Sequence, residues 1–249
     1  MRKCLIFLAL GALLLAPALA QKSTCAFCHH DGSQSPLVEL PYVDQPRMVC
    51  ERCVQRLPHC TVCDLPTDKK QHRDGRYLCA SCLKTGVSSQ AQAEKLYKDI
   101  VRFVDGLLGA NVKPLPPVRL CDVDELQTRH MEGGRAIQVA GFYQAYNPEQ
   151  IYLMSYEMPI RCGATLAHEY THAWQSRHSV QQDRALKEGF ASWVEYHYLV
   201  SQHRTDLAES LRRCPDPDYG ASLNKLLEIE RSKGRAEVLK LGRTGTKLP

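Results

Sequence analysis

The sequence has no long block of basic residues and, after residue 15, no apolar stretch long enough to cross a membrane. Its 249 residues include 32 Lys and Arg and 27 Asp and Glu, which gives a net charge of +5, and the two signs alternate along the chain. This distribution lacks the basic patch that nucleic-acid binding requires, so we expect no nucleic-acid partner. A hydrophobic share of 44% instead indicates one or two globular domains.

The first twenty residues have the features of a secretory signal peptide in the required order. Arg2 and Lys3 precede an apolar run over residues 4–15, and the small-residue pattern at residues 18–20 follows it. A membrane anchor would need roughly 20 apolar residues, and this run is shorter. No Cys stands at the cut to carry a lipid. We therefore expect cleavage before Gln21 and export, to a periplasm or out of the cell, with no membrane span in the remaining chain.

Cysteine is plentiful and unevenly distributed. Of the twelve cysteines, Cys4 lies in the leader, and Cys121, Cys162 and Cys214 stand alone in the second half. The other eight form four Cys-x-x-Cys pairs, which are Cys25/Cys28, Cys50/Cys53, Cys60/Cys63 and Cys79/Cys82. This distribution predicts three regions: a signal peptide over 1–20, a cysteine-rich module over 21–86 and a second domain over 87–249.

The cysteine pairs predict two structural zinc sites. Each pair directs two sulfurs at one point, so two pairs in chain order complete the tetrahedral thiolate shell that Zn²⁺ prefers. A segment of about sixty residues with few large apolar side chains needs such cross-links. Four disulfides are the alternative in an oxidising compartment, and a redox role lacks the strand–helix context it needs. The nearby His29, His30 and His59 are expected to be solvated rather than ligands.

The second half of the module carries a family resemblance. The stretch Cys60-Thr-Val-Cys63, followed by Asp74-Gly75-Arg76-Tyr77-Leu78-Cys79-Ala-Ser-Cys82, is similar to the second half of a LIM domain. The first half departs from that pattern, because Cys50 replaces the usual His and six residues separate Cys53 from Cys60. The resemblance implies a LIM-like double zinc ribbon that serves in targeting or regulation through a protein partner.

The chain after Gly86 has the patterns of helices and short strands. Apolar residues recur every three or four positions over residues 88–108, which predicts an amphipathic helix. Strand formers gather at 118–123, 136–142 and 150–156, and a turn signal at Asn147-Pro148 separates the last two. We therefore expect an α+β fold, in which a small sheet precedes a mainly helical half.

The stretch Leu166-Ala-His168-Glu169-Tyr-Thr-His172-Ala-Trp174 contains a His-Glu-x-x-His motif with apolar flanks. Four residues advance about 400° on a helix, so both His side chains project from one face and can bind one metal ion. Glu169 lies about 100° round the helix, within reach of a water on the metal. The motif predicts a zinc site with His168 and His172 as ligands and Glu169 as the general base.

A catalytic zinc ion generally has a third protein ligand. The run from Leu186 to Glu195 reads as a second helix, with Glu188, Ser192 and Glu195 on one face. We choose Glu188 as the third ligand, with Glu195 as its competitor, because the small Gly189 beside it predicts a close approach to the first helix. Solvated helix charges are the ordinary alternative for both Glu residues.

The combined pattern resembles one peptidase family. No third His extends the motif, which favours the two-His, one-Glu arrangement of the gluzincins. A LIM-like module followed by Met158-Pro159, the motif helix and Glu188-Gly189 is similar to the DA-type LIM peptidases, which have bacterial relatives, and Asp218-Tyr219-Gly220 extends the likeness. The resemblance implies a gluzincin-like zinc metallopeptidase that cleaves proteins. One departure is Ser192, where gluzincins often have an Asp that orients a ligand His.

Three expectations concern the reaction. Glu169 should take a proton from a water on the zinc and deliver it to the leaving amine of a peptide bond. The oxyanion should be stabilised by Tyr196, His197 or Tyr219, among which the sequence does not choose. An extended substrate should pair with an exposed sheet edge, for which residues 150–156 are our candidate. The alternative function is a zinc-stabilised interaction module with an inactive peptidase-like domain.

Overall fold

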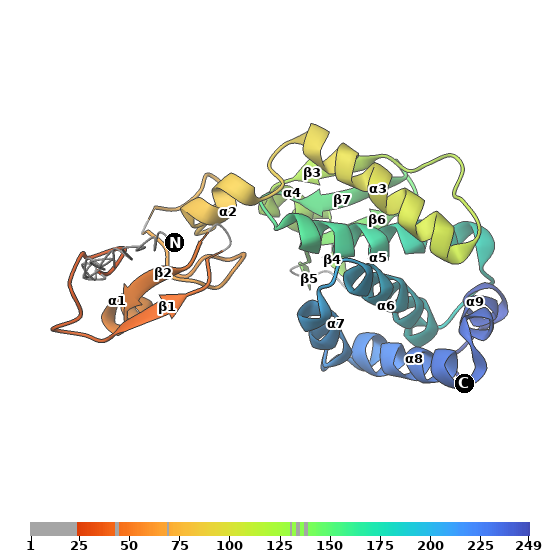
Figure 1. Cartoon of the computed structure of the whole chain (residues 1–249). Helices are drawn as coiled ribbons and strands as arrows, with labels where there is room; N and C mark the ends of the chain where they lie inside the picture. Colours follow the sequence, from red (N-terminus) through yellow and green to blue (C-terminus); the bar gives the residue numbers. More distant parts are fainter. Residues whose placement is uncertain (1–23, 43–44, 69, 130, 133–134, 137–138) are drawn as a thin grey trace, which may run out of the picture.

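The computed structural model describes residues 24–42, 45–68, 70–129, 131–132, 135–136 and 139–249. The expected signal peptide lies outside the described residues. Figure 1 shows two lobes, a small one that contains β1, β2, α1 and α2 and a larger, mainly helical one formed by the rest of the chain. The predicted α+β class is confirmed.

The small lobe is built around sulfur rather than around large apolar side chains. An antiparallel pair, β1 (Leu37–Leu40) and β2 (Arg47–Cys50), leads directly into α1 (Glu51–Arg56), and α2 (Ala80–Thr85) ends the lobe. Five of its nine fully buried apolar residues are cysteines. So small a core cannot support the lobe alone, which is why cross-links at the cysteines matter for its stability.

The larger lobe contains a three-stranded sheet in the order β3-β7-β6. β3 (Val118–Cys121) runs parallel to β7 (Gln150–Met154), and β6 (Gly141–Gln144) runs antiparallel to it. Alternate side chains of β7 face opposite ways: Ile151 and Leu153 pack with α3 (Gln90–Leu108) and α5 (Pro159–His178), whereas Tyr152 and Met154 pack with α4 (Val123–Arg129). A short hairpin, β4 (Met131–Glu132) with β5 (Arg135–Ala136), follows α4.

Three strand predictions need correction. The segment 150–156 is wrong as an edge strand, because β7 is hydrogen-bonded to a strand on each side. The edges belong to β3 and β6, and the side chain of Gln90 from α3 hydrogen-bonds to the backbone of β3, so the uncovered edge is that of β6. Of the described residues in the strand predicted over 136–142, Ala136 ends β5 and Gly141 starts β6. The strand predicted over 118–123 ends at Cys121. Asp122 ends this strand, since its side chain accepts the backbone N–H of Glu125 at 2.9 Å and starts α4.

Of the remaining helices, α6 packs against α5, and the others pack mainly around α6 (Figure 1). They are α6 (Arg184–Ser201), α7 (Thr205–Arg212), the π-helical turn η1 (Pro217–Ala221), α8 (Ser222–Lys233) and α9 (Arg235–Thr244). α5 approaches α6 closely at Gly163, which faces the ring of Tyr198. We had expected Gly189 to allow this contact between α5 and α6, but it lies elsewhere. A β-carbon at Gly189 would lie 2.6 Å from Ser222, so this glycine allows α8 to approach α6.

The two lobes meet at the connection between β7 and α5. The buried Arg76 of the small lobe donates to the carbonyl oxygen of Ser155 at 3.1 Å and ion-pairs with Asp74 at 2.6 Å. Backbone hydrogen bonds also join Val87 to Tyr156 and Glu157. The small lobe is thereby attached directly to the segment that starts α5. Among the described residues, no helix is both long and apolar enough to cross a membrane.

Candidate metal centres

Within the described part of the chain, three groups of side chains could hold a metal ion. In each group the donor atoms lie within 4.8 Å of one another. The groups are Cys25, Cys28, Cys50 and Cys53; Cys60, Cys63, Cys79 and Cys82; and His168, His172 and Glu188. The chain-order pairing expected of the cysteines and the chosen set of two His and one Glu are both brought together in space.

The eight cysteines of the small lobe are free thiols. The sulfurs of Cys28 and Cys50 are 3.6 Å apart and those of Cys63 and Cys79 are 3.8 Å apart, well beyond a disulfide bond of roughly 2.05 Å. Burial raises the pKa of Cys25, but hydrogen bonds from the backbone of Cys28 and Cys50 outweigh it and lower the pKa to about 6. Two groups of four sulfurs fit the tetrahedral thiolate sites of zinc.

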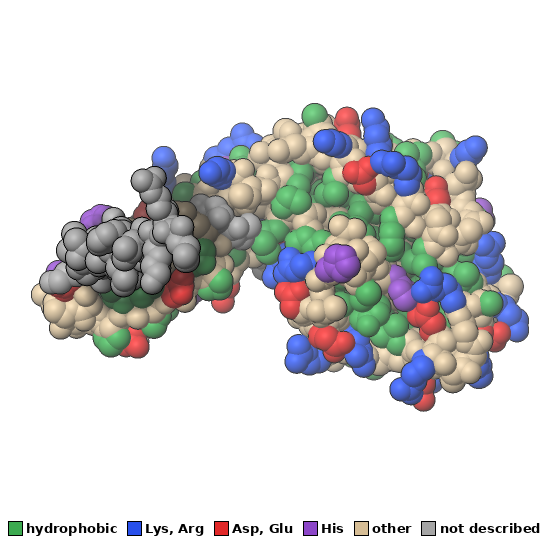
Figure 2. All heavy atoms as spheres, viewed as in Figure 1, with side chains coloured by type: hydrophobic (Ala, Val, Ile, Leu, Met, Phe, Trp, Pro, Cys, Tyr) green, Lys and Arg blue, Asp and Glu red, His purple; other side chains and the backbone are tan. Residues whose placement is uncertain are grey.

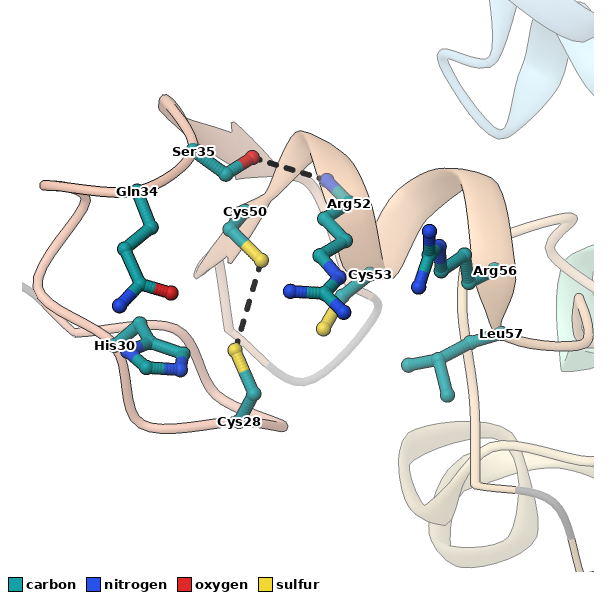
Figure 3. Close-up of a pocket in the computed structure, with 9 residues that line it drawn as sticks. All are labelled: Cys28, His30, Gln34, Ser35, Cys50, Arg52, Cys53, Arg56 and Leu57. Carbon is teal, nitrogen blue, oxygen red and sulfur yellow. Dashed lines mark hydrogen bonds between the residues drawn. The ribbon is translucent and has the colours of Figure 1, made fainter.

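Positive side chains accompany the first cysteine group. Figure 3 shows the guanidinium group of Arg52 near the sulfurs of Cys50 and Cys53, and Arg56 further along α1. They line a cavity of about 350 Å³. Four thiolates around Zn²⁺ leave a net charge of about −2, which nearby guanidinium groups offset. The side chains of His29, His30 and His59 are all exposed, as we predicted.

The third group lies between α5 and α6. The Nε2 atoms of His168 and His172 are 3.3 and 3.2 Å from Oε2 of Glu188. Asp183 caps α6 by accepting the backbone N–H of Leu186, which sets Glu188 in the second turn, opposite the two imidazoles. The donors therefore converge from two helices, and two His with one carboxylate match the ligand set of a catalytic zinc site, which keeps one position open.

The other ring nitrogen of each His has its own acceptor. Nδ1 of His168 is 3.1 Å from Glu195 Oε2, and Nδ1 of His172 is 2.8 Å from Gln175 Oε1. An Nδ1–H that donates to an acceptor leaves Nε2 free for a metal ion and fixes the ring. Glu195, the competitor for the third ligand position, therefore contacts the ring nitrogen of His168 that points away from Glu188. It is placed to orient His168, the role that an Asp at the position of Ser192 often has in gluzincins.

The charges of this group are strongly coupled. Burial lowers the pKa of His168, but its hydrogen bonds to Glu188 and Glu195 outweigh burial and raise that pKa to about 10. Burial raises the pKa of Glu188, whereas hydrogen bonds from both His side chains lower it by more. The same carboxylates thus favour the protonated form of His168, and binding of a metal ion at its Nε2 would release that proton.

Glu169 lies in the same cavity without joining the donor group. Its Oε2 accepts the backbone N–H of Tyr143, on the exposed edge strand β6, at 2.8 Å. Burial raises the pKa of Glu169, and the two neighbouring His side chains oppose that shift only in part. A carboxylate whose pKa is raised toward neutrality is suited to accept and return a proton.

The structure separates the three candidates for an oxyanion donor. Tyr219, on η1, stacks on His168 with ring centroids 5.8 Å apart and lines the cavity. His197 instead hydrogen-bonds to Glu230 at 2.8 Å, and Tyr196 packs against the hydrophobic core. Burial, with the charges of Glu188 and Glu169, raises the pKa of Tyr219, so its hydroxyl stays protonated and able to donate.

These side chains line an open cavity of about 640 Å³. It is bounded on one side by β6 and on the other by η1 and the first turns of α6. Arg184 and Lys187 add positive charge at its rim. A cavity of this volume, open to solvent beside an exposed strand, can admit a segment of another polypeptide chain.

Compared with known proteins, the chain matches no family model, no curated protein and no solved structure. The assignment of function therefore depends on the site itself.

Sequence reasoning missed two residues of this site, Gln175 and Tyr143. Gln175 follows His172 by three positions, a spacing at which helix side chains meet, so this contact could have been predicted. Tyr143 acts through its backbone N–H, which any residue would supply, and no sequence signal marks it.

Proposed function

We propose that this chain is a zinc-dependent endopeptidase that hydrolyses peptide bonds of protein substrates, related to the DA-type LIM peptidases and exported to the periplasm or the extracellular medium. The observation that carries the proposal is the convergence of His168, His172 and Glu188 on one point, with Glu169 beside them in the same open cavity. The cysteine-rich lobe would serve in targeting or regulation through a protein partner.

Zinc, when bound by His168, His172 and Glu188, would supply Lewis acidity and lower the pKa of a water toward neutrality. Glu169 accepts a proton from the attacking water, whose oxygen forms a bond to the carbonyl carbon of the substrate. The C–N bond then breaks, and Glu169 returns that proton to the leaving amine. The backbone N–H of Tyr143 holds the Glu169 carboxylate in place for both transfers.

Tyr219 is our choice for the oxyanion donor, since it alone of the three candidates lines the cavity. Removal of one such donor typically lowers kcat by roughly 100- to 1,000-fold. Tyr219→Phe should therefore lose most of the activity while the content of catalytic zinc is unchanged. Unchanged kcat in Tyr219→Phe would remove Tyr219 from the mechanism.

The decisive experiment compares the wild-type chain with Glu169→Gln on an unfolded protein substrate. The variant should lose hydrolysis and keep its zinc, measured by elemental mass spectrometry, because Glu169 is a base and not a ligand. Glu228→Gln, an exposed change on α8, is the matched control and should cleave normally. Equal cleavage by wild type and Glu169→Gln, or none by wild type with its zinc in place, would leave the inactive interaction module as the better description.

A further inference from the structure

A second cavity, of about 530 Å³, lies beside the metal centre. We call it the side cavity. The hydrogen bond between His168 and Glu195 separates the two spaces, because His168 lines the metal cavity and Glu195 lines the side cavity. Both cavities also reach the start of β6. Gly141, the first residue of β6, lines the metal cavity, and the preceding Ala140 lines the side cavity.

An extended peptide on the exposed edge of β6 would pass both cavities. The backbone N–H of Tyr143 donates to Glu169, the proposed general base. The scissile bond must lie close to Glu169, so it lies near Tyr143 as well. Ala140 is three residues from Tyr143, which corresponds to roughly 10 Å along a strand. A substrate side chain within about three residues of the scissile bond can therefore enter the side cavity.

The walls of the side cavity combine apolar surface with unpaired guanidinium groups. Leu199, Leu207 and Leu211 supply apolar wall from α6 and α7. The side chain of Arg161 forms neither a hydrogen bond nor an ion pair with any described residue, and the side chain of Arg213 uses only its Nε, toward the carbonyl oxygen of Glu209 at 3.2 Å. Both guanidinium groups thus keep donors available for an incoming acceptor.

Two carboxylates also line the side cavity. The charge of Arg161 acts on Glu157, but neither carboxylate forms an ion pair with Arg161 or Arg213. Glu195 is engaged with Nδ1 of His168. Glu157 is 7% exposed and accepts the backbone N–H of Met158 at 3.2 Å. Burial raises the pKa of Glu157, because the charged form is poorly solvated there. The charged groups of the side cavity that keep hydrogen-bond donors available are therefore the two guanidinium groups.

We propose that the side cavity is a substrate subsite that selects an acidic side chain near the scissile bond, with Arg161 and Arg213 as the specificity-determining residues. The apolar wall would accept the methylene groups of a glutamate, and the guanidinium groups would bind its carboxylate in a paired geometry. This inference rests on the proposed peptidase function.

The test uses peptides that are identical except for Glu, Gln, Leu or Lys at each of the three positions on either side of the cleaved bond. At one position the wild-type chain should prefer Glu over Gln by roughly 10- to 100-fold in kcat/KM, the value of a hydrogen-bonded charge. In Arg161→Glu and Arg213→Glu this preference should fall and shift toward Lys. Arg102→Glu on α3, an exposed residue, is the matched control and should keep the wild-type profile.

Equal cleavage of Glu and Gln peptides by wild type at every position would overturn the inference and leave the peptidase proposal standing. A wild-type preference for Lys that Glu157→Gln abolishes would also overturn it, in favour of the buried carboxylate. Absence of any cleavage beyond that of Glu169→Gln would remove both proposals. If an Arg→Glu variant fails to fold, Arg→Gln at the same position replaces it, and an unchanged Glu preference in that variant counts against the inference.

Discussion

Replacement of Glu195 distinguishes an orienting carboxylate from a metal ligand. Its Oε2 lies 3.1 Å from Nδ1 of His168, whereas Glu188 lies within 3.3 Å of the Nε2 atoms of both His side chains. Loss of a partner behind a ligand His typically weakens metal binding by roughly 10- to 100-fold, or about 1.4 to 2.7 kcal/mol. Glu195 is 19% exposed and borders the side cavity, so water can replace part of its hydrogen bond. We therefore expect Glu195→Ala near the lower end of that range.

Two further variants calibrate this prediction. Glu195→Gln keeps an acceptor oxygen without the charge, so it should weaken binding by less than Glu195→Ala. Glu188→Ala removes a ligand and should weaken binding by more than 100-fold. In the measurement, a coloured chelator competes with the protein for zinc. The affinity compared among the variants is that of the weakest of the three zinc sites. Our assignment is refuted if Glu195→Ala loses as much affinity as Glu188→Ala, or if Glu195→Ala binds zinc as the wild type does.

The remaining predictions concern stability. In Gly163→Ala, the new methyl group would overlap the buried hydroxyl of Tyr198, and overpacking of this kind costs about 1–3 kcal/mol, so thermal unfolding should occur at a lower temperature; an unchanged Tm would contradict the packing described. Arg76→Ala should cost about 3–5 kcal/mol in denaturant unfolding, because Asp74 is left buried without its cation, and Arg102→Ala, from an exposed pair, should cost under about 1 kcal/mol. Burial raises the pKa of Asp74, but hydrogen bonds from Arg76 and His72 outweigh burial and lower the pKa to about 2. The contribution of Asp74 to stability is therefore present above about pH 4 and is lost as the pH falls toward 2. Acid titration of the wild type should show this loss of stability, and acid titration of Arg76→Ala should not. A strong chelator should unfold the small lobe under non-reducing conditions if the cysteines hold zinc, whereas resistance to the chelator together with sensitivity to reductant would indicate disulfides.

Local spacing predicted the parts of the site that local geometry determines. The i, i+4 relation put His168 and His172 on one helix face, and the Cys-x-x-Cys pairs in chain order matched the groups in the structure. The choice between Glu188 and Glu195 was harder, since both occupy one face of α6 and only the crossing of α5 and α6 decides which carboxylate reaches the Nε2 side.

The errors arose where a segment depends on contacts distant in sequence. β7 is central because β3, about thirty residues earlier, pairs with it in parallel, and alternation within 150–156 carries no information about that partner. Gly189 was assigned to the wrong helix contact for the same reason: a small residue permits close approach without indicating which helix approaches, and here it is α8.

The attachment of the small lobe to the β7–α5 connection has a consequence for truncation. Tyr156 and Met158, just before the motif helix, pack into the cysteine-rich core, and Val87 pairs with this connection through backbone hydrogen bonds. A chain shortened to residues 87–249 would expose these side chains to water and release Ser155 from Arg76. Such a fragment should aggregate more readily than the full chain, and loss of metal from the cysteine groups should be felt at the first turn of α5, some two turns before His168.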